Sequence, residues 1–221
     1  LAERWSLHGG ARRSEVRFTS RDSFITAANP DDSGARDFSA TTPVAGVLYR
    51  ASPRLTLYGN LGRGFETPTF VELAYRSVGS GLNFDLDASE SRHAELGAKM
   101  IVASALRINA ALFEVVTQDE IVVEQNVGGR AVYRNAGHTD RRGLELAAET
   151  VTAGPWQARL AWSYIEATFR EGFVSGGIPV PAGSELPGVP RSQLYAELRY
   201  RGAGWYAQLE GLRRSRVPVN D

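Results

Sequence analysis

Alternation between apolar and polar side chains constrains this chain more than any other feature. Between Trp156 and Tyr164 every second residue is apolar or aromatic, and the residues between them are mostly polar. The same period of two recurs in the segments 93–100, 106–113, 144–149 and 193–200. Successive side chains of a β-strand point to opposite faces of a sheet, so each segment is expected to be a strand with one apolar face. The sequence predicts an all-β fold, with a helical pattern only in the short stretch Phe70 to Leu73.

The connections between the expected strands fall into two classes that take turns along the chain. Short connections are predicted at 51–54, 103–104, 152–155 and 201–204. Long excursions are predicted between them, at 19–36, 63–89, 119–140 and 169–190. Short turns at one end and long loops at the other are typical of transmembrane β-barrels, whose strands need about ten residues to cross a bilayer at a tilt. A soluble sandwich or adhesin also has sheets with one apolar face, and it remains an alternative.

Large aromatic residues lie near the ends of the expected strands. They are Trp5, Trp156, Trp162, Tyr164, Trp205 and Tyr206. Because Trp and Tyr gather at both membrane interfaces, this placement favours an apolar face that meets lipid and a charged face that meets a water-filled lumen. The charged residues expected on the lumen face are Glu95, Lys99, Arg107, Glu145, Glu149, Arg159, Glu197 and Arg199. Their positions predict charge ladders between adjacent strands.

The composition excludes several classes of function. The chain has 221 residues with 25 basic and 25 acidic side chains, so no net charge favours a nucleic-acid partner. The absence of cysteine rules out disulfides and thiolate metal sites. The three histidines, His8, His93 and His138, are too scattered to form a metal cluster. We predict no catalytic residue, no metal site and no cofactor.

Four stretches, taken in order, resemble the TonB-dependent outer-membrane receptors. "LTLYGNLGRGFETPTFVELAYR" (55–76) resembles the family's strand and loop with Gly-Phe-x-x-Pro-Thr and Glu-Leu, and "SESRHAELGAK" (89–99) resembles the strand that returns after this loop. "LFEVVTQDEIV" together with "YRNAGHTDRRGLELAAE" (112–149) resembles a hairpin followed by Asn-Ala-Gly and Arg-Gly-x-Glu. "LAWSYIEATF" with "LPGVPRSQLYAELRY" (160–200) resembles the next hairpin and its return. The resemblance covers nearly the whole chain from about Arg4.

The resemblance implies that residues 1–221 are one incomplete β-barrel domain. We expect about ten antiparallel strands from the later part of a barrel that, in outer-membrane transporters, has about twenty-two strands and a plugged lumen. The sequence starts without an initiator methionine or signal segment, and we expect a fragment of a longer protein. The amino-terminal plug and the short segment that engages TonB are expected to lie outside it.

The function implied by the resemblance is active transport across the cell outer membrane. Such a receptor binds a scarce nutrient, most often a ferric siderophore or similar metal chelate, and TonB energises its import. Aromatic and cationic loop side chains suit an anionic, often aromatic chelate, and the predicted ligand-binding residues are Tyr75, Arg76, Tyr133, Arg134 and His138. A passive porin or an outer-membrane barrel enzyme would share the strand pattern, and both remain alternatives.

The stretch from Gly62 to Pro68 is predicted to be a structural strand exit that faces the plug. Gly62 and Gly64 give the backbone freedom where the strand leaves the sheet. Pro68 interrupts the ladder and is expected to open the short helical turn. We expect Arg63 and Glu66 to hold this corner by hydrogen bonds.

Overall fold

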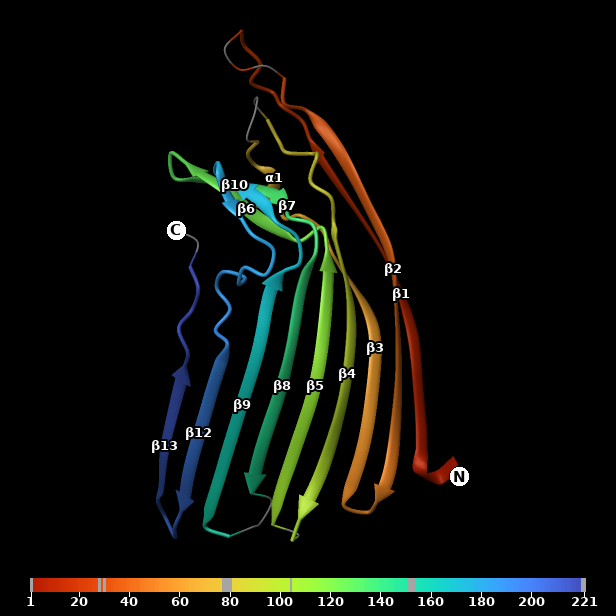
Figure 1. Cartoon of the computed structure of the whole chain (residues 1–221), viewed down its shortest axis with the longest axis vertical. Coiled ribbons are helices and arrows are strands. Elements are labelled where there is room, and N and C mark those ends of the chain that lie inside the picture. Colours follow the sequence, from red (N-terminus) through yellow and green to blue (C-terminus); the bar gives the residue numbers. More distant parts are fainter. Residues whose placement is uncertain are drawn as a thin grey trace.

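One long antiparallel sheet dominates the structure. The computed structural model describes residues 2–27, 29, 31–76, 81–103, 105–150 and 154–219. Within these residues the sheet has nine strands, in the order β1 (Trp5–Ser20), β2 (Gly34–Ser52), β3 (Leu55–Glu66), β4 (Ser89–Val102), β5 (Leu106–Gln118), β8 (Thr139–Thr150), β9 (Trp156–Phe169), β12 (Ser192–Arg201) and β13 (Tyr206–Arg214). Each strand pairs with the next sheet strand along the chain, so the sheet is a simple meander (Figure 1).

Two small hairpins interrupt the meander where the sequence predicted long loops. β6 (Ile121–Val127) pairs with β7 (Arg130–Asn135), and β10 (Phe173–Ser175) pairs with β11 (Ile178–Val180). The helical elements of the described part are the turn η1 (Ala2–Arg4) and α1 (Phe70–Leu73), the latter at the predicted position. Figure 1 shows α1 and the hairpins gathered at one end of the sheet, whereas the short turns lie at the other.

The two predicted classes of connection are confirmed wherever the chain is described. β2 and β3 are joined by residues 53–54, and β12 and β13 by residues 202–205. Part of the other two predicted short turns, Ser104 and residues 151–153, lies outside the described residues. Among the described residues, no helix is long and apolar enough to cross a membrane.

One face of the sheet is lined by apolar side chains, and we call it the apolar face. Strand register places Leu96, Leu112, Leu144 and Tyr164 side by side across β4, β5, β8 and β9. Leu96 and Leu112 are 69% and 60% exposed, and the Trp156 and Leu160 side chains are also exposed, so no second layer covers this face within the described residues. The alternation in the sequence therefore predicted correctly which residues share each face.

The opposite face, which we call the polar face, carries the predicted charge ladder. Arg107, Glu149 and Arg159 are directly opposite one another on β5, β8 and β9. Nη1 of Arg107 donates to Oε1 of Glu149 over 2.7 Å, and Nη2 of Arg159 donates to Oε2 of Glu149 over 3.4 Å. Opposite charges at directly paired positions stabilise neighbouring strands, so this ladder ties three strands together.

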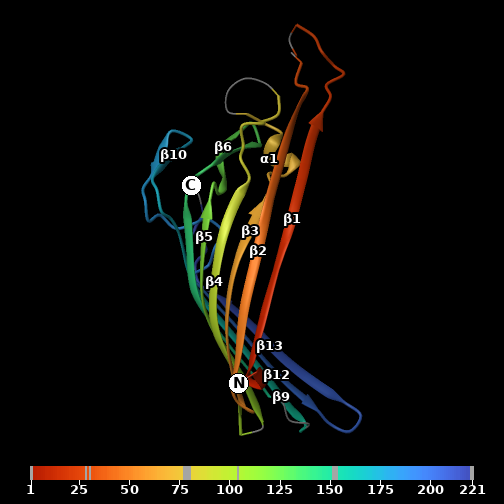
Figure 2. The same ribbon diagram turned by 90° about the vertical axis from the view of Figure 1, so that its right-hand side faces the viewer.

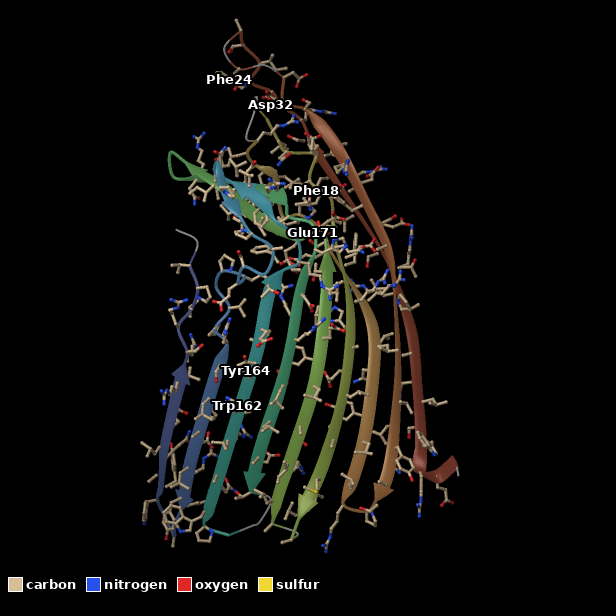
Figure 3. All side chains as sticks on the ribbon, viewed as in Figure 1. Phe18, Phe24, Asp32, Trp162, Tyr164 and Glu171 are labelled. Atoms are coloured by element: carbon tan, nitrogen blue, oxygen red, sulfur yellow. The ribbon has the colours of Figure 1, made fainter. Side chains whose placement is uncertain are left out.

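Aromatic pairs mark the short-turn end of the sheet. The ring centroids of Trp5 and Tyr49 are 4.4 Å apart on β1 and β2. Tyr200 lies 4.7 Å from Trp156 and 4.8 Å from Trp205, so β9, β12 and the turn before β13 share one cluster. Figure 3 places Trp162 and Tyr164 further along β9, toward the long loops. These positions fit the two girdles expected of a barrel in a bilayer.

The apolar core of the described chain lies at the long-loop end. Ala136, Ala167, Phe169 and Leu186 form a buried cluster against which Val122 of β6 and other partly buried residues pack. Ala167 and Phe169 alternate with the apolar-face residues of β9 and therefore belong to the polar face. The loops thus fold over the polar face, while Figure 2 shows the curvature of the sheet beneath them.

Candidate functional site in the long loops

A pocket of about 700 Å³ opens among the long loops. Its walls come from three segments: the end of β1 with the residues after it, the segment that follows α1, and the start of β7. The charged and aromatic side chains that line it are Arg21, Asp22, Asp32, Tyr75, Arg76 and Arg130. Its volume lies within the range of small-molecule sites, about 300 to 1,000 Å³. We call this cavity the loop pocket.

The helix α1 fixes where residues 75–76 enter the loop pocket. Thr69 is its N-cap: Oγ1 of Thr69 accepts from the backbone N–H of Glu72 over 3.3 Å, and the backbone N–H of Thr69 donates to Oε2 of Glu72 over 2.6 Å. This reciprocal capping box stabilises a helix of only four residues. The last helical residue, Leu73, is fully buried, so the chain leaves the helix from an anchored point.

Tyr75 and Arg76 each have one charged partner at the loop pocket. The guanidinium of Arg130 lies 4.9 Å from the centroid of the Tyr75 ring, within the range of a cation–π interaction. Arg76 forms an ion pair with Asp85. Arg130 was not among the predicted ligand residues, although the Gly128-Gly129 pair before it, between alternating residues, is a signal for a hairpin turn.

Asp22 and Asp32 form the acidic wall of the loop pocket, and Asp22 is fixed by hydrogen bonds within its own loop. Oδ1 of Asp22 accepts the backbone N–H of Phe24 over 2.8 Å, and Oδ2 of Asp22 accepts from Nδ2 of Asn29 over 3.4 Å. In the same loop, hydrogen bonds from the Ser33 side chain and backbone lower the pKa of Asp31 from its ordinary value. These local bonds give the wall a defined shape before any ligand binds.

The other three predicted ligand residues, Tyr133, Arg134 and His138, do not line the loop pocket. Nη1 of Arg134 donates to the backbone oxygen of Val174 over 2.9 Å, and Nδ1 of His138 lies 2.7 Å from Oε1 of Glu171. The backbone oxygen of Tyr133 accepts from Nδ2 of Asn83 over 3.1 Å. Figure 3 shows Glu171 where the sheet strands end and Asp32 farther out. The structure therefore joins Tyr75 and Arg76 in one pocket but places Arg134 and His138 against the β10 region.

The predicted strand exit divides between the two faces of the sheet. Gly62, Gly64 and Glu66 are paired with polar-face residues of β4. Arg63 is paired with Arg92 and lies on the apolar face, so its grouping with the plug-facing residues was wrong, because neighbouring side chains of a strand point in opposite directions. Within the described residues, the side chains of Arg63 and Glu66 form no hydrogen bond or ion pair.

Pro68 is buried and lies just before the N-cap of α1. It therefore precedes the helical turn, and Phe70 is the first helical residue. The interruption of the ladder agrees with the prediction, since β3 ends at Glu66 and the chain then leaves the sheet. The short helix depends on the Thr69 cap that follows the proline.

Asn135, the last residue of β7, joins its strand to two other segments at the long-loop end. Its Nδ2 donates to the backbone oxygens of Asp87 over 3.0 Å and of Asp119 over 2.8 Å, and its Oδ1 accepts the backbone N–H of Asp87 over 2.9 Å. Nearby, Nη2 of Arg141 donates to Oε1 of Glu120 over 2.7 Å in a largely buried ion pair. Hydrogen bonds and an ion pair therefore fix the loops to the ends of the strands.

The chemistry of the loop pocket suits an anion. Three guanidinium groups lie around it against two carboxylates, and guanidinium forks bind carboxylate, phenolate or phosphate oxygens through several N–H groups at once. The described residues contain no group of three or more His, Cys, Asp or Glu residues that could hold a metal ion. The pocket lining thus combines guanidinium donors with the aromatic face of Tyr75.

The sheet has short turns at one end and a polar pocket among long loops at the other. This combination is typical of the wall of a transmembrane β-barrel. Residues 1–220 match the model of the family described as "TonB dependent receptor-like, beta-barrel". The chain belongs to this family of TonB-dependent receptors, and its sheet is part of a transmembrane antiparallel β-barrel. The membership favours the predicted receptor over the sandwich, porin and enzyme alternatives.

Solved structures of similar fold include several uptake proteins. The copper transporter OprC matches with a TM-score of 0.73 and 20% identity, over 94% of this chain and 32% of its own. The siderophore receptor PiuA from Acinetobacter baumannii matches with a TM-score of 0.71 and 17% identity, over 97% and 31%. The ferric yersiniabactin uptake receptor FyuA from Yersinia pestis matches with a TM-score of 0.67 and 20% identity, over 94% and 30%. The chain thus spans about a third of their length, and at these identities the likeness concerns the fold.

Proposed function

We propose that this chain forms the loop-bearing wall of an outer-membrane receptor that binds an anionic metal chelate, in particular a ferric siderophore. The loop pocket carries this proposal, because Arg76, Arg130 and Tyr75 surround one cavity at the long-loop end of a receptor barrel. Import is energised by TonB, acting through a segment of the receptor beyond this sequence. The polar face lines the passage, and its charge ladders support the plug.

An anionic chelate suits the loop pocket better than a bare metal ion does. The copper transporter OprC is among the similar folds, so a free cation is the ligand to compare. The lining carries three guanidinium groups against two carboxylates, and this excess of positive charge disfavours a divalent cation and favours the net negative charge of a chelate. The exposed ring of Tyr75 also offers a surface for the aromatic groups that many chelators carry.

The test is ligand binding by the full-length receptor. We expect Arg76→Gln combined with Arg130→Gln to weaken binding of the cognate ferric chelate about tenfold or more, because each lost guanidinium removes charge-assisted hydrogen bonds. A panel of ferric catecholates, hydroxamates and carboxylates, measured by fluorescence quenching, first identifies the chelate. Arg201→Gln, at the short-turn end, serves as the matched control.

The same assay separates the two groups of predicted ligand residues. Arg134→Gln and His138→Gln test whether the region near β10 also contacts the chelate. Unchanged affinity in these variants would confine the site to the loop pocket. Unchanged affinity in the Arg76 and Arg130 variant would refute the proposed site, and no binding of any ferric chelate would refute the proposed ligand class.

A further inference from the structure

Two arginines face each other on the apolar face without an acidic partner. Arg63 of β3 is directly opposite Arg92 of β4, and both side chains are exposed. Within the described residues, neither guanidinium forms a hydrogen bond or an ion pair. Like charges at directly opposite positions destabilise a strand pair, so this pairing has a cost unless something outside the sheet neutralises it.

Neighbouring charges on the same face are arranged differently. Arg17 pairs with Asp37 over 2.6 Å, and Arg142 pairs with Glu114 over 2.8 Å and with Asp140 over 3.0 Å. The carboxylates nearest to Arg92 in the ladder are Glu90, which forms no ion pair among the described residues, and Glu114, which Arg142 already engages. The pair Arg63 and Arg92 therefore stands out as an uncompensated double positive charge.

The two arginines lie where the apolar band ends. On β4 every apolar-face residue from Val102 to Ala94 is apolar, and Arg92 is next; on β3 the series Leu55 to Leu61 is followed by Arg63. The ten steps from Val102 to Arg92 span roughly 33 Å along the strand. At the usual tilt of roughly 40° this becomes about 25 Å across the bilayer, the height of the apolar band of such barrels. The guanidinium groups thus reach the headgroup level on the long-loop side.

We propose that Arg63 and Arg92 together bind the phosphate group of an anionic lipid in the outer leaflet of the membrane. Their guanidinium groups offer several N–H donors toward the same region, and Arg is well suited to phosphate oxygens. Below them, Leu61 and Leu96 are 64% and 69% exposed on the same face, so the acyl chains of the bound lipid extend along these side chains. The phosphate supplies the negative charge that the strand pair lacks.

The experiment counts lipid bound to the full-length receptor in a neutral detergent by native mass spectrometry. The probe is lipid A with its phosphates, compared with dephosphorylated lipid A that has the same acyl chains. We expect Arg63→Gln combined with Arg92→Gln to bind the phosphorylated lipid about tenfold more weakly, because two charge-assisted contacts are lost. Arg63→Lys combined with Arg92→Lys keeps the charge and is expected to retain most of the binding.

The matched control removes two positive charges from the other face. Arg12 and Arg50 are exposed, lie on the polar face, and form no ion pair within the described residues, so Arg12→Gln with Arg50→Gln should leave lipid binding unchanged. Equal binding of the two lipids by the wild-type receptor would overturn the proposal. Undiminished binding by the glutamine variant, or displacement of the lipid by millimolar inorganic phosphate, would overturn it as well. Chelate binding should be the same in all variants, which separates this test from that of the loop pocket.

Discussion

Single glycines set how closely the strands of this wall approach bulky neighbours. A Cβ atom built on Gly143 would lie 2.4 Å from Cζ of Phe113 and 2.6 Å from the backbone oxygen of Tyr164. Similarly, a Cβ atom on Gly97 would lie 2.3 Å from Cζ of Tyr58. The aromatic rings therefore lie over glycines of adjacent strands and cover them, which gives a chemical reason for the glycine in the Arg-Gly-x-Glu motif.

We predict that Gly143→Ala destabilises the full-length barrel by about 1 to 3 kcal/mol, because overpacking against a backbone oxygen cannot be relieved by a side-chain rotation. The measurement is urea unfolding in lipid vesicles. The folded fraction is read from the gel mobility of unheated samples compared with heated ones. Gly211→Ala is the control, since a Cβ atom added there would meet open space within 4 Å. Equal stability of the two variants would show that the sheet accommodates the added methyl group at Gly143 without cost.

At the scale of elements, Asn135 connects the ends of β4, β5 and β7 through Asp87 and Asp119. We predict that Asn135→Ala speeds amide hydrogen exchange in residues 81–90 and 119–121, because three hydrogen bonds to backbone groups are lost together. Asn126→Ala, at an exposed position near the tip of the β6–β7 hairpin, is the control and should leave exchange there unchanged. Identical exchange in both variants would show that Asn135 does not anchor these segments.

The strands could be predicted from sequence because each has one face that must be apolar. Leu96, Leu112 and Leu144 show this in adjacent strands. The β10–β11 hairpin was missed, although Gly176 and Gly177 both have positive φ, as a tight hairpin turn requires. Its strands have only three residues each, too few for alternation to show.

The candidate site could be predicted only in part, because distant segments assemble it. Loop position and side-chain chemistry selected Tyr75 and Arg76, whereas Arg130 reaches the same pocket from a hairpin more than fifty positions later. Arg134 has the same chemistry, yet its partner is Val174, which lies 40 residues further along the chain. Residue type and local spacing carry no information about such pairings, since they depend on how the loops fold over the polar face.

At the scale of the whole molecule, the described sheet has two edges, β1 and β13, and an exposed apolar face. On β13 every residue is exposed, and on β1 Leu7 is 80% exposed. Unpaired edges and exposed apolar rows promote association between chains in water. In a closed barrel, neighbouring strands would pair both edges and lipid would cover the apolar rows.

We therefore predict that residues 1–221, produced alone in water without detergent, associate into β-rich aggregates instead of folding as a monomer. Light scattering and amide hydrogen exchange check this, with the full-length receptor in detergent as the control for a protected, monomeric barrel. Two substitutions distinguish edge pairing from apolar association: Leu209→Lys on the apolar face of β13, and Gly211→Pro, which removes a backbone donor from that strand. A soluble monomer with protected amides in all nine strands would contradict the assignment of the apolar face to lipid.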